Sequence, residues 1–157
     1  MLKKIFAAGV AFFMVTACHH GHDHQYYTDD KGELSEIIPG SQEDLTINVG
    51  DRVHFMKNHS SLSSDAQETL KKQVMWLQAN PDVVVTIEGH CDERGTKAFN
   101  LALGERRAES VKKFMVAHGI DSTRVYTISF GKERPEFYGH NSTAWAKNRR
   151  AVTVVTD

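Results

Sequence analysis

The chain has 157 residues and carries 19 lysines and arginines against 20 aspartates and glutamates, so its formal net charge is −1. Nucleic-acid-binding proteins usually show a clustered excess of basic residues, which this composition lacks. Beyond its first residues, the chain has no apolar run close to the ~20 residues that cross a bilayer as a helix.

The first 17 residues have the pattern of a cleaved export signal. Lys3 and Lys4 precede an apolar run at 5–14 that is too short to span a membrane. The next residues, Val-Thr-Ala-Cys, resemble the bacterial lipobox. We therefore predict cleavage before Cys18 and lipidation of that cysteine; an ordinary secretory signal with an incidental cysteine is the alternative. Loss of the two lysines would leave 17 cations against 20 acids, a net charge of −3.

Lipidation of Cys18 would hold the mature chain at a membrane without crossing it. Two or more acyl chains make a stable anchor, whereas a single chain binds reversibly. Cys91 is the other cysteine of the chain, so a lipidated Cys18 leaves it no partner for an internal disulfide. The fold must then be held by its apolar core.

Residues 18–44 are predicted to be a flexible tether, because they contain too few apolar residues to form a core. Some 26 residues would span roughly 28 Å as a coil and at most about 90 Å when fully extended. The tether begins with four histidines, namely His19, His20, His22 and His24. Together with Asp23 they could bind zinc, nickel or copper, and a metal-binding periplasmic lipoprotein is the alternative function. A solvated linker is the simpler interpretation, because a tether lacks the rigid support of a metal site.

The first part of residues 45–157 is predicted to hold a hairpin or two strands, followed by a helix. Apolar residues alternate with polar ones from Leu45 to Val49 and again around Val53 and Phe55. Ser64 and Gln67 have the spacing of a capping box. The apolar stripe of the helix is expected to be Ala66, Leu70, Val74 and Leu77, and the pair Asn80-Pro81 should end it.

The rest of the chain alternates between strands and helices. Strands are predicted at 83–88, 124–130 and 151–155, and helices at 98–118 and 142–147. Gly119 is the expected glycine cap of the longer helix. The fold class is therefore α/β, a two-layer sandwich of βαβαβ type with the helices packed on one mixed sheet.

The turn after the strand at 83–88 gathers charged side chains around two glycines. Asp92 follows the strand directly, and strand C-termini are the usual place for ligand sites in α/β folds. Arg107 lies fifteen residues later, where it can lean back over the turn. A carboxylate and a guanidinium facing one pocket would suit a ligand that carries both an ammonium and a carboxylate. A salt bridge between Asp92 and Arg107 that only holds the loop is the alternative.

An enzyme that uses His90, Cys91 and Asp92 is the third class considered. Three adjacent residues on a turn point in different directions, whereas catalytic triads and metal sites are assembled from separate segments. We therefore expect no catalytic activity and no cofactor.

The motifs around this turn resemble those of OmpA-like peptidoglycan-binding domains over about residues 45–155. The single residues that carry the resemblance are Gly89, His90, Cys91, Asp92, Gly95, Asn100, Leu103, Arg107, Ala108, Val111, Gly119, Ile120, Gly131, Pro135, Asn148, Arg149 and Arg150. The runs DERGT, LGERRA, SFGKERP and AWAKNRRAV are similar to a subfamily of lipoproteins associated with peptidoglycan.

This resemblance implies non-covalent binding of diaminopimelate in the peptidoglycan stem peptide. Asp92 would take the ligand's ammonium and Arg107 its carboxylate, and both Asp92→Ala and Arg107→Ala are expected to fold. The further residues implied in the site are Glu93, Arg94, Gly95 and Thr96 through their main chain, with Asn148 and Arg149 beside the pocket. Asn58 stands where the family usually has an aspartate, so it can accept a hydrogen bond but brings no charge.

The implied function is that of an outer-membrane lipoprotein which links that membrane to the cell wall within a Tol-Pal-type system. Its partners would be peptidoglycan, the outer membrane through the lipid anchor, the periplasmic propeller protein of the Tol system and other Tol-Pal components. No nucleic acid is expected among the partners, and the domain from residue 45 onward would lie in the periplasm.

Overall fold

The computed structural model of the chain describes residues 26–28 and 34–156. Cys18 and the histidines at 19–24 lie outside the described residues, so the predicted lipidation and metal binding stay predictions. Within the described part, no helix is long and apolar enough to span a membrane.

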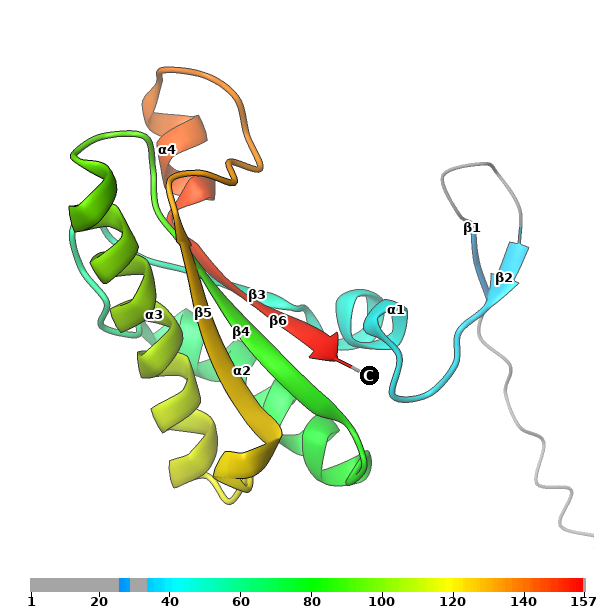
Figure 1. Cartoon of the computed structure of the whole chain (residues 1–157). Coiled ribbons are helices and arrows are strands. Elements are labelled where there is room, and N and C mark those ends of the chain that lie inside the picture. Colours follow the sequence, from blue (N-terminus) through cyan, green and yellow to red (C-terminus); the bar gives the residue numbers. More distant parts are fainter. Residues whose placement is uncertain (1–25, 29–33, 157) are drawn as a thin grey trace, which may run out of the picture.

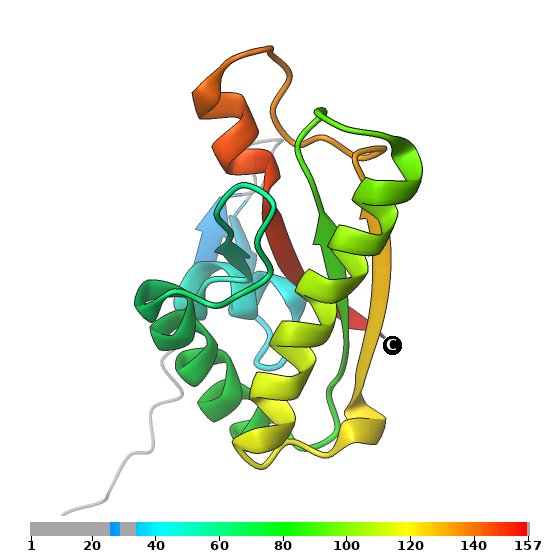
Figure 2. The ribbon, with the colours of Figure 1, turned by 90° about the vertical axis from the view of Figure 1, so that its left-hand side faces the viewer.

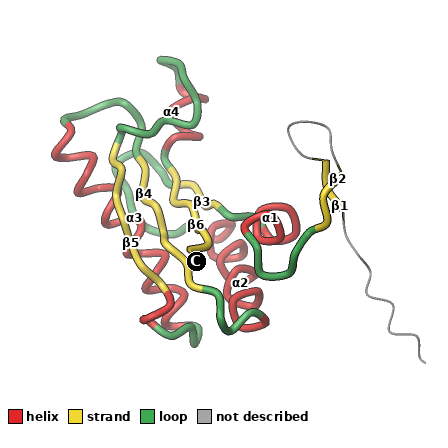
Figure 3. Tube along the Cα trace, turned by 45° about the vertical axis from the view of Figure 1, so that its right-hand side comes forward, coloured by secondary structure: helices red, strands yellow, loops and turns green. Residues whose placement is uncertain are grey.

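The centre of the fold is a mixed sheet of four strands in the order β3-β6-β4-β5 (Figures 1 and 3). The strands are β3 (Arg52–His54), β4 (Val84–His90), β5 (Val125–Gly131) and β6 (Arg150–Thr156). β4 pairs with β5 in parallel, whereas β6 runs antiparallel to both β3 and β4. This confirms the predicted α/β class with a mixed sheet.

Two long helices, α2 (Ser64–Ala79) and α3 (Lys97–Ala117), cover one face of this sheet (Figure 2). The predicted stripe of α2 is buried, from Ala66 to Leu77. Gly119 follows α3 with φ +94°, as expected of a glycine cap. A short 3-10 turn, η2 (Ser122–Arg124), leads into β5, and α4 (Ser142–Asn148) leads into β6.

The predicted strand at 45–49 is wrong, because this segment is helical. α1 (Gln42–Asp44) continues directly into η1 (Leu45–Val49), a π-helical turn in which the Gly50 N–H donates to the Leu45 carbonyl (2.8 Å). Leu45 is fully buried, while Ile47 is 51% exposed, so the alternating residues do not share one buried face. Leu45 is buried in the core and Val49 packs against it, so tertiary contacts outweigh the local alternation.

Residues 40–44, assigned from the sequence to the tether, contact the domain. The Gln42 side chain accepts from the Val155 N–H (2.7 Å) and donates to the Thr153 carbonyl (3.4 Å), both in β6. The Asp44 carboxylate accepts from the indole of Trp76 in α2 (2.8 Å). The same predicted tether contains two short antiparallel strands, β1 (Tyr26–Thr28) and β2 (Leu34–Glu36), drawn apart from the sheet in Figure 1.

The N-cap of α2 is Ser63, so the predicted capping box of Ser64 and Gln67 is wrong. The Ser63 hydroxyl accepts from the Ala66 N–H (3.2 Å), and the Gln67 amide donates to the Leu62 carbonyl (3.3 Å). The two serines are adjacent in sequence, and only the extended backbone of Ser63 allows its side chain to cap the helix.

Replacing Ser63 with alanine should lower the free energy of unfolding by about 1 kcal/mol, since an N–H of the first turn loses its acceptor. Ser64→Ala is the matched control: it removes a hydroxyl one residue further along, inside the helix, and should change stability by only a few tenths of that amount. Urea unfolding followed by circular dichroism compares the two. A larger loss for Ser64→Ala would contradict the observed cap.

Candidate ligand site at the end of the central strand

Asp92 lies one residue beyond Cys91, where the chain leaves β4. Its side chain is largely buried, and the whole residue is 7% exposed. Oδ1 accepts from the backbone N–H (3.1 Å) and from Nε (3.0 Å) of Arg94, and Oδ2 accepts from Nη2 of the same arginine (2.6 Å). Nη1 of Arg149 lies 3.4 Å from Oδ2. The carboxylate therefore faces two guanidinium groups, neither of which belongs to Arg107.

Asp92 carries a full negative charge at neutral pH. Burial alone would raise its pKa, but the hydrogen bonds from the side chain and backbone of Arg94 outweigh that effect, and the pKa lies below its usual value. The site thus contains a preformed anion in a partly dehydrated position, where a bound cation is attracted more strongly than at an exposed surface.

Arg107 is fully buried and connects two segments of the fold. From α3, its Nη1 donates to the carbonyl of His90 (2.7 Å), its Nε to that of His59 (3.0 Å) and its Nη2 to that of Met56 (3.1 Å). Burial lowers the pKa of this guanidinium, but the group remains charged. Because Arg107 bridges the end of β4 and the loop before α2, we no longer expect Arg107→Ala to fold as well as the unmodified chain.

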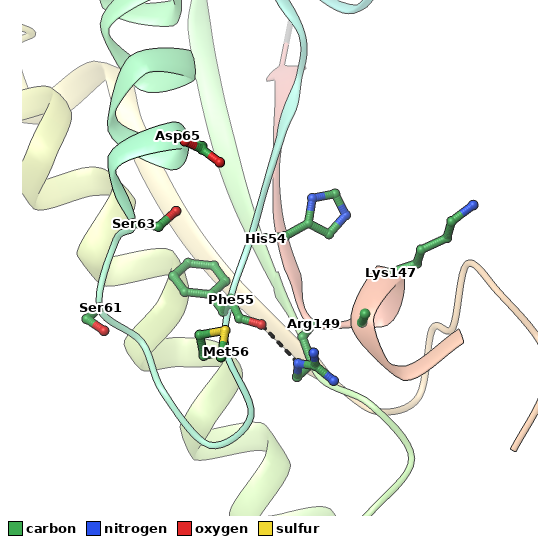
Figure 4. Close-up of a pocket in the computed structure, with 9 residues that line it drawn as sticks. His54, Phe55, Met56, Ser61, Ser63, Asp65, Lys147 and Arg149 are labelled. Atoms are coloured by element: carbon green, nitrogen blue, oxygen red, sulfur yellow. Dashed lines mark hydrogen bonds between the residues drawn. The ribbon is translucent and has the colours of Figure 1, made fainter. Parts of the chain in front are cut away.

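Arg149 forms a wall of the site from the end of α4. Its Nε donates to the carbonyl of Phe55 (2.9 Å), a contact visible in Figure 4, while its Nη1 faces Asp92. Asn58 lies in the same loop as Met56, with a positive φ of 60° and an exposed side chain. The turn at Asn58 therefore requires a residue that tolerates the left-handed conformation, which asparagine does better than most.

Five of the predicted site residues line one small cavity of about 10 Å³, namely Asn58, Asp92, Arg94, Arg107 and Arg149. The acid from the β4–α3 turn and the guanidinium from α3 therefore converge, but the space between them is too small for a ligand in this state. The salt bridge considered between Asp92 and Arg107 does not form; Asp92 instead pairs with Arg94 and Arg149.

The main chain of the turn is already engaged. The Arg94 N–H donates to Asp92, and the carbonyls of Glu93 and Gly95 accept from the ammonium of Lys132 (3.2 and 2.7 Å). Gly95 has φ +95°, which explains the glycine at this position. Thr96 caps α3 by accepting from the Phe99 N–H (3.2 Å). These bonds give the turn one well-defined path. They also engage part of the main chain at 93–96 that was predicted to contact the ligand.

Asn148 does not line the cavity with Asp92. Its Oδ1 accepts from the N–H groups of Glu136 (2.9 Å) and Phe137 (3.0 Å), and its Nδ2 donates to the Phe137 carbonyl (2.7 Å). The side chain thus holds the loop between β5 and α4, and its predicted place beside the ligand stays a prediction. The neighbouring Arg150 is buried as well and pairs with Glu136 (2.9 Å).

His90 and Cys91, the residues considered for an enzyme, are both buried. Burial, then the charges of Arg150 and Arg134, lowers the pKa of His90 to about 3, so the imidazole is neutral at pH 7. Burial raises the pKa of the Cys91 thiol, which donates to the Asn100 carbonyl (3.3 Å). Both side chains pack beneath the turn, and no cluster of metal-binding side chains is found among the residues that the structure describes.

Residues 54–149 match the model of the OmpA family, a span that includes β4, α3, the charged turn and α4. The chain belongs to the OmpA family.

Similarity to individual proteins extends well beyond this core of the OmpA family. A peptidoglycan-associated lipoprotein of Brucella melitensis is 51% identical over 150 residues, which cover 93% of this chain and 89% of that protein. A peptidoglycan-associated lipoprotein of Agrobacterium fabrum is 47% identical over 124 residues, covering 79% and 70%. The resemblance inferred from the motifs is therefore confirmed by similarity along most of the chain.

Solved structures agree with the OmpA-family fold. The crystal structure of the peptidoglycan-associated lipoprotein from Burkholderia pseudomallei has a TM-score of 0.66 at 36% identity, covering 68% of this chain and 90% of that one. The C-terminal domain of MotB from Helicobacter pylori, at 17% identity, has a TM-score of 0.64 over 68% of this chain and 84% of that one. The second likeness concerns the fold alone.

A groove beside the site was not predicted from the sequence. It has a volume of about 530 Å³ and lies between the loop that precedes α2 and the end of α4 (Figure 4). Its lining residues are His54, Phe55, Met56, Ser61, Ser63, Asp65, Ala146, Lys147 and Arg149. These residues come from two segments about 80 positions apart, so no local motif marks them. Arg149 belongs to both the groove and the Asp92 cavity.

Proposed function

We propose that this chain is a lipid-anchored protein that binds peptidoglycan without covalent chemistry, through diaminopimelate of the stem peptide. Asp92 takes the ammonium of the ligand's amino-acid end, and Arg107 with Arg149 faces its carboxylate. The names of the relatives support the coarse function, since proteins about 50% identical to this chain are called peptidoglycan-associated lipoproteins.

One observation carries the assignment of the ligand. A largely buried, ionised aspartate and three arginines line the same cavity, and this combination of charges can complement a zwitterion. Arg107 is held by three carbonyls, so its guanidinium is oriented before any ligand arrives. Such preorganisation lowers the entropic cost of binding.

The expected affinity is modest, in the micromolar range. A charge-assisted hydrogen bond contributes about 1.5–3 kcal/mol when it is buried, and a few of them must also offset the cost of association. Many copies anchored in one membrane and facing one continuous polymer gain avidity without any new contact. Individually weak contacts therefore suffice to hold a membrane to a cell wall.

The anchor of this proposed link is Cys18 in the outer membrane, with the domain in the periplasm. Components of a Tol system are the proposed protein partners. The lipoprotein names of the relatives support the anchor, and the polar segment before the domain supplies the reach between membrane and wall.

Asp92→Asn is expected to weaken binding to isolated sacculi at least ~10-fold, because a neutral amide cannot balance the ligand's ammonium. Asp82→Asn, in the exposed turn before β4, is the matched control: it makes the same change of charge away from the cavity and should bind normally. Co-sedimentation with sacculi and calorimetry with a diaminopimelate-containing stem tripeptide measure the difference.

Unchanged sedimentation of Asp92→Asn would contradict the proposed site. Deleting residues 19–24 tests the alternative function in the same assay: the peptidoglycan-binding proposal expects sedimentation to persist, whereas its loss would favour a role of the histidines.

A further inference from the structure

The side chain of Arg94 fills the position at which a ligand's cation would meet Asp92. Its guanidinium holds the carboxylate with two parallel bonds, Nε to Oδ1 (3.0 Å) and Nη2 to Oδ2 (2.6 Å). Two parallel charge-assisted bonds hold a carboxylate more strongly and more specifically than one. The volume left in the cavity is about 10 Å³. Asp92 is therefore already occupied by a residue two positions further along the chain.

A separate element of the fold holds Arg94 in this position. The guanidinium lies over the indole of Trp145 in α4, 4.0 Å from the ring centroid. The Trp145 Nε1 donates to Glu93 Oε1 (2.7 Å), and His140 Nδ1 lies 2.6 Å from the other oxygen of the same carboxylate. Contacts from two segments therefore hold the Arg94 side chain in one position, unlike a free side chain on the surface.

Arg94 can leave without disturbing the core. Its side chain is 31% exposed, compared with 9% for that of Asp92. Arg149, the other arginine at this carboxylate, is bonded through Nε to the Phe55 carbonyl and lies further away, at 3.4 Å. Arg94 is therefore the cation that a ligand can displace, while Arg149 stays as a wall of the site.

We propose that Arg94 is an internal competitor for the ligand's ammonium, so that it closes the empty site and sets its affinity. This inference rests on the proposed function. When the stem peptide binds, its ammonium replaces the guanidinium at Asp92, and Arg94 swings away from both Asp92 and Trp145 into solvent. The competition also keeps Asp92 ionised and paired when no ligand is present, so the charge is never left buried alone.

Closure of the site by Arg94 weakens the apparent binding, because only the open fraction of the molecules can take up the ligand. If binding requires the open state, the apparent dissociation constant equals the intrinsic one divided by the open fraction. Removing the competitor raises that fraction toward one. An unusual result follows: truncation of a charged residue in the site should tighten binding.

The test uses the full-length chain in detergent, titrated calorimetrically with a diaminopimelate-containing stem tripeptide. Arg94→Gln should bind about three to ten times more tightly than the unmodified chain, as expected when the closed state is populated several-fold over the open one. Arg106→Gln is the matched control, since it removes the same charge from an exposed residue of α3. Arg94→Lys should fall between, because an ammonium cannot make the two parallel bonds.

Weaker binding by Arg94→Gln would overturn the inference and make Arg94 a contact of the ligand. Equal binding would overturn it as well, since Arg94 would then not compete. In both cases the proposed function stands if the unmodified chain binds and Asp92→Asn does not. If the unmodified chain fails to bind the tripeptide, the proposed function itself fails.

Fluorescence of Trp145 provides a readout that a merely structural role of Arg94 would not move. Displacement of the guanidinium from the indole should change its emission when the tripeptide binds. The other tryptophan, Trp76, is buried against Asp44 and should not respond. The signal should disappear in Trp145→Phe and in Arg94→Gln; a ligand-induced change that persists in Arg94→Gln would speak against displacement.

Discussion

Replacing Gly89 with alanine should lower the free energy of unfolding by about 4 kcal/mol or more, a loss that only severe clashes cause. A Cβ at this position would lie 1.9 Å from the carbonyl oxygen and 2.5 Å from the carbonyl carbon of Gly104. Both atoms belong to the backbone of α3, so no rotation of a side chain relieves the overlap. The helix would have to move away from β4.

Gly50→Ala separates this steric effect from the conformational cost of losing a glycine. Gly50 has φ +94°, but a Cβ added there would meet no clash, since the nearest atom is a methyl group of Thr69 at 3.8 Å. Its replacement should therefore cost only the backbone strain, about 1–3 kcal/mol. Thermal and urea unfolding followed by circular dichroism measure both variants. A stability of Gly89→Ala equal to or above that of Gly50→Ala would contradict the tight contact between β4 and α3.

The Gly89 contact also matters for the site, because α3 carries Arg107 and begins at the charged turn. A helix displaced from β4 would draw the guanidinium of Arg107 away from the carbonyl of His90. We therefore expect any Gly89→Ala protein that remains folded to lose ligand binding together with stability.

Arg107→Met should lower the free energy of unfolding by about 3 kcal/mol or more. The side chain keeps a similar length, but the buried carbonyl of His90 and the partly buried carbonyls of Met56 and His59 lose their donor, and an unsatisfied buried group costs about 1–3 kcal/mol. Some of that cost is recovered where water can enter near the loop. Urea unfolding measures the change.

The adjacent Arg106 provides a control that differs by one position in sequence. It is exposed on α3, and Arg106→Met should change stability by no more than about 0.5 kcal/mol. Similar stabilities of the two variants would show that Arg107 does not hold the loop before α2. Arg107→Met should lose ligand binding whether Arg107 contacts the ligand or only holds the loop before α2. Asp92→Asn therefore remains the cleaner test of the site.

The long elements of the fold could be predicted because their sequences are strongly periodic. The stripe of α2 and the apolar strand β4 each bury what their patterns indicate, and Gly119 ends α3 with the expected positive φ. The segment at 45–49 is helical and not the predicted strand, because five residues contain too little pattern to outweigh tertiary contacts. There, Leu45 is buried beside α2, and Gln42 and Asp44 just before it bond to β6 and α2.

In the candidate site, the charged residues of the turn could be named from the sequence, but their pairing could not. Arg94 is two residues from Asp92, and nothing local says that its side chain turns back onto that carboxylate. Trp145, which holds it there, lies 53 positions after Asp92. The partners of Asn148 could not be predicted either: its side-chain amide bonds to the backbone at 136–137, and it does not line the Asp92 cavity.

By itself, the amino-acid sequence determined the α/β class, the order of the main elements and the charged turn after β4, since periodicity and glycine placement act over short distances. Only the tertiary structure decided which cation occupies Asp92, that Arg107 is a buried brace and that a groove lies beside Arg149. The physical reason is that these contacts join segments far apart in the chain, where packing selects one partner among several of equal charge.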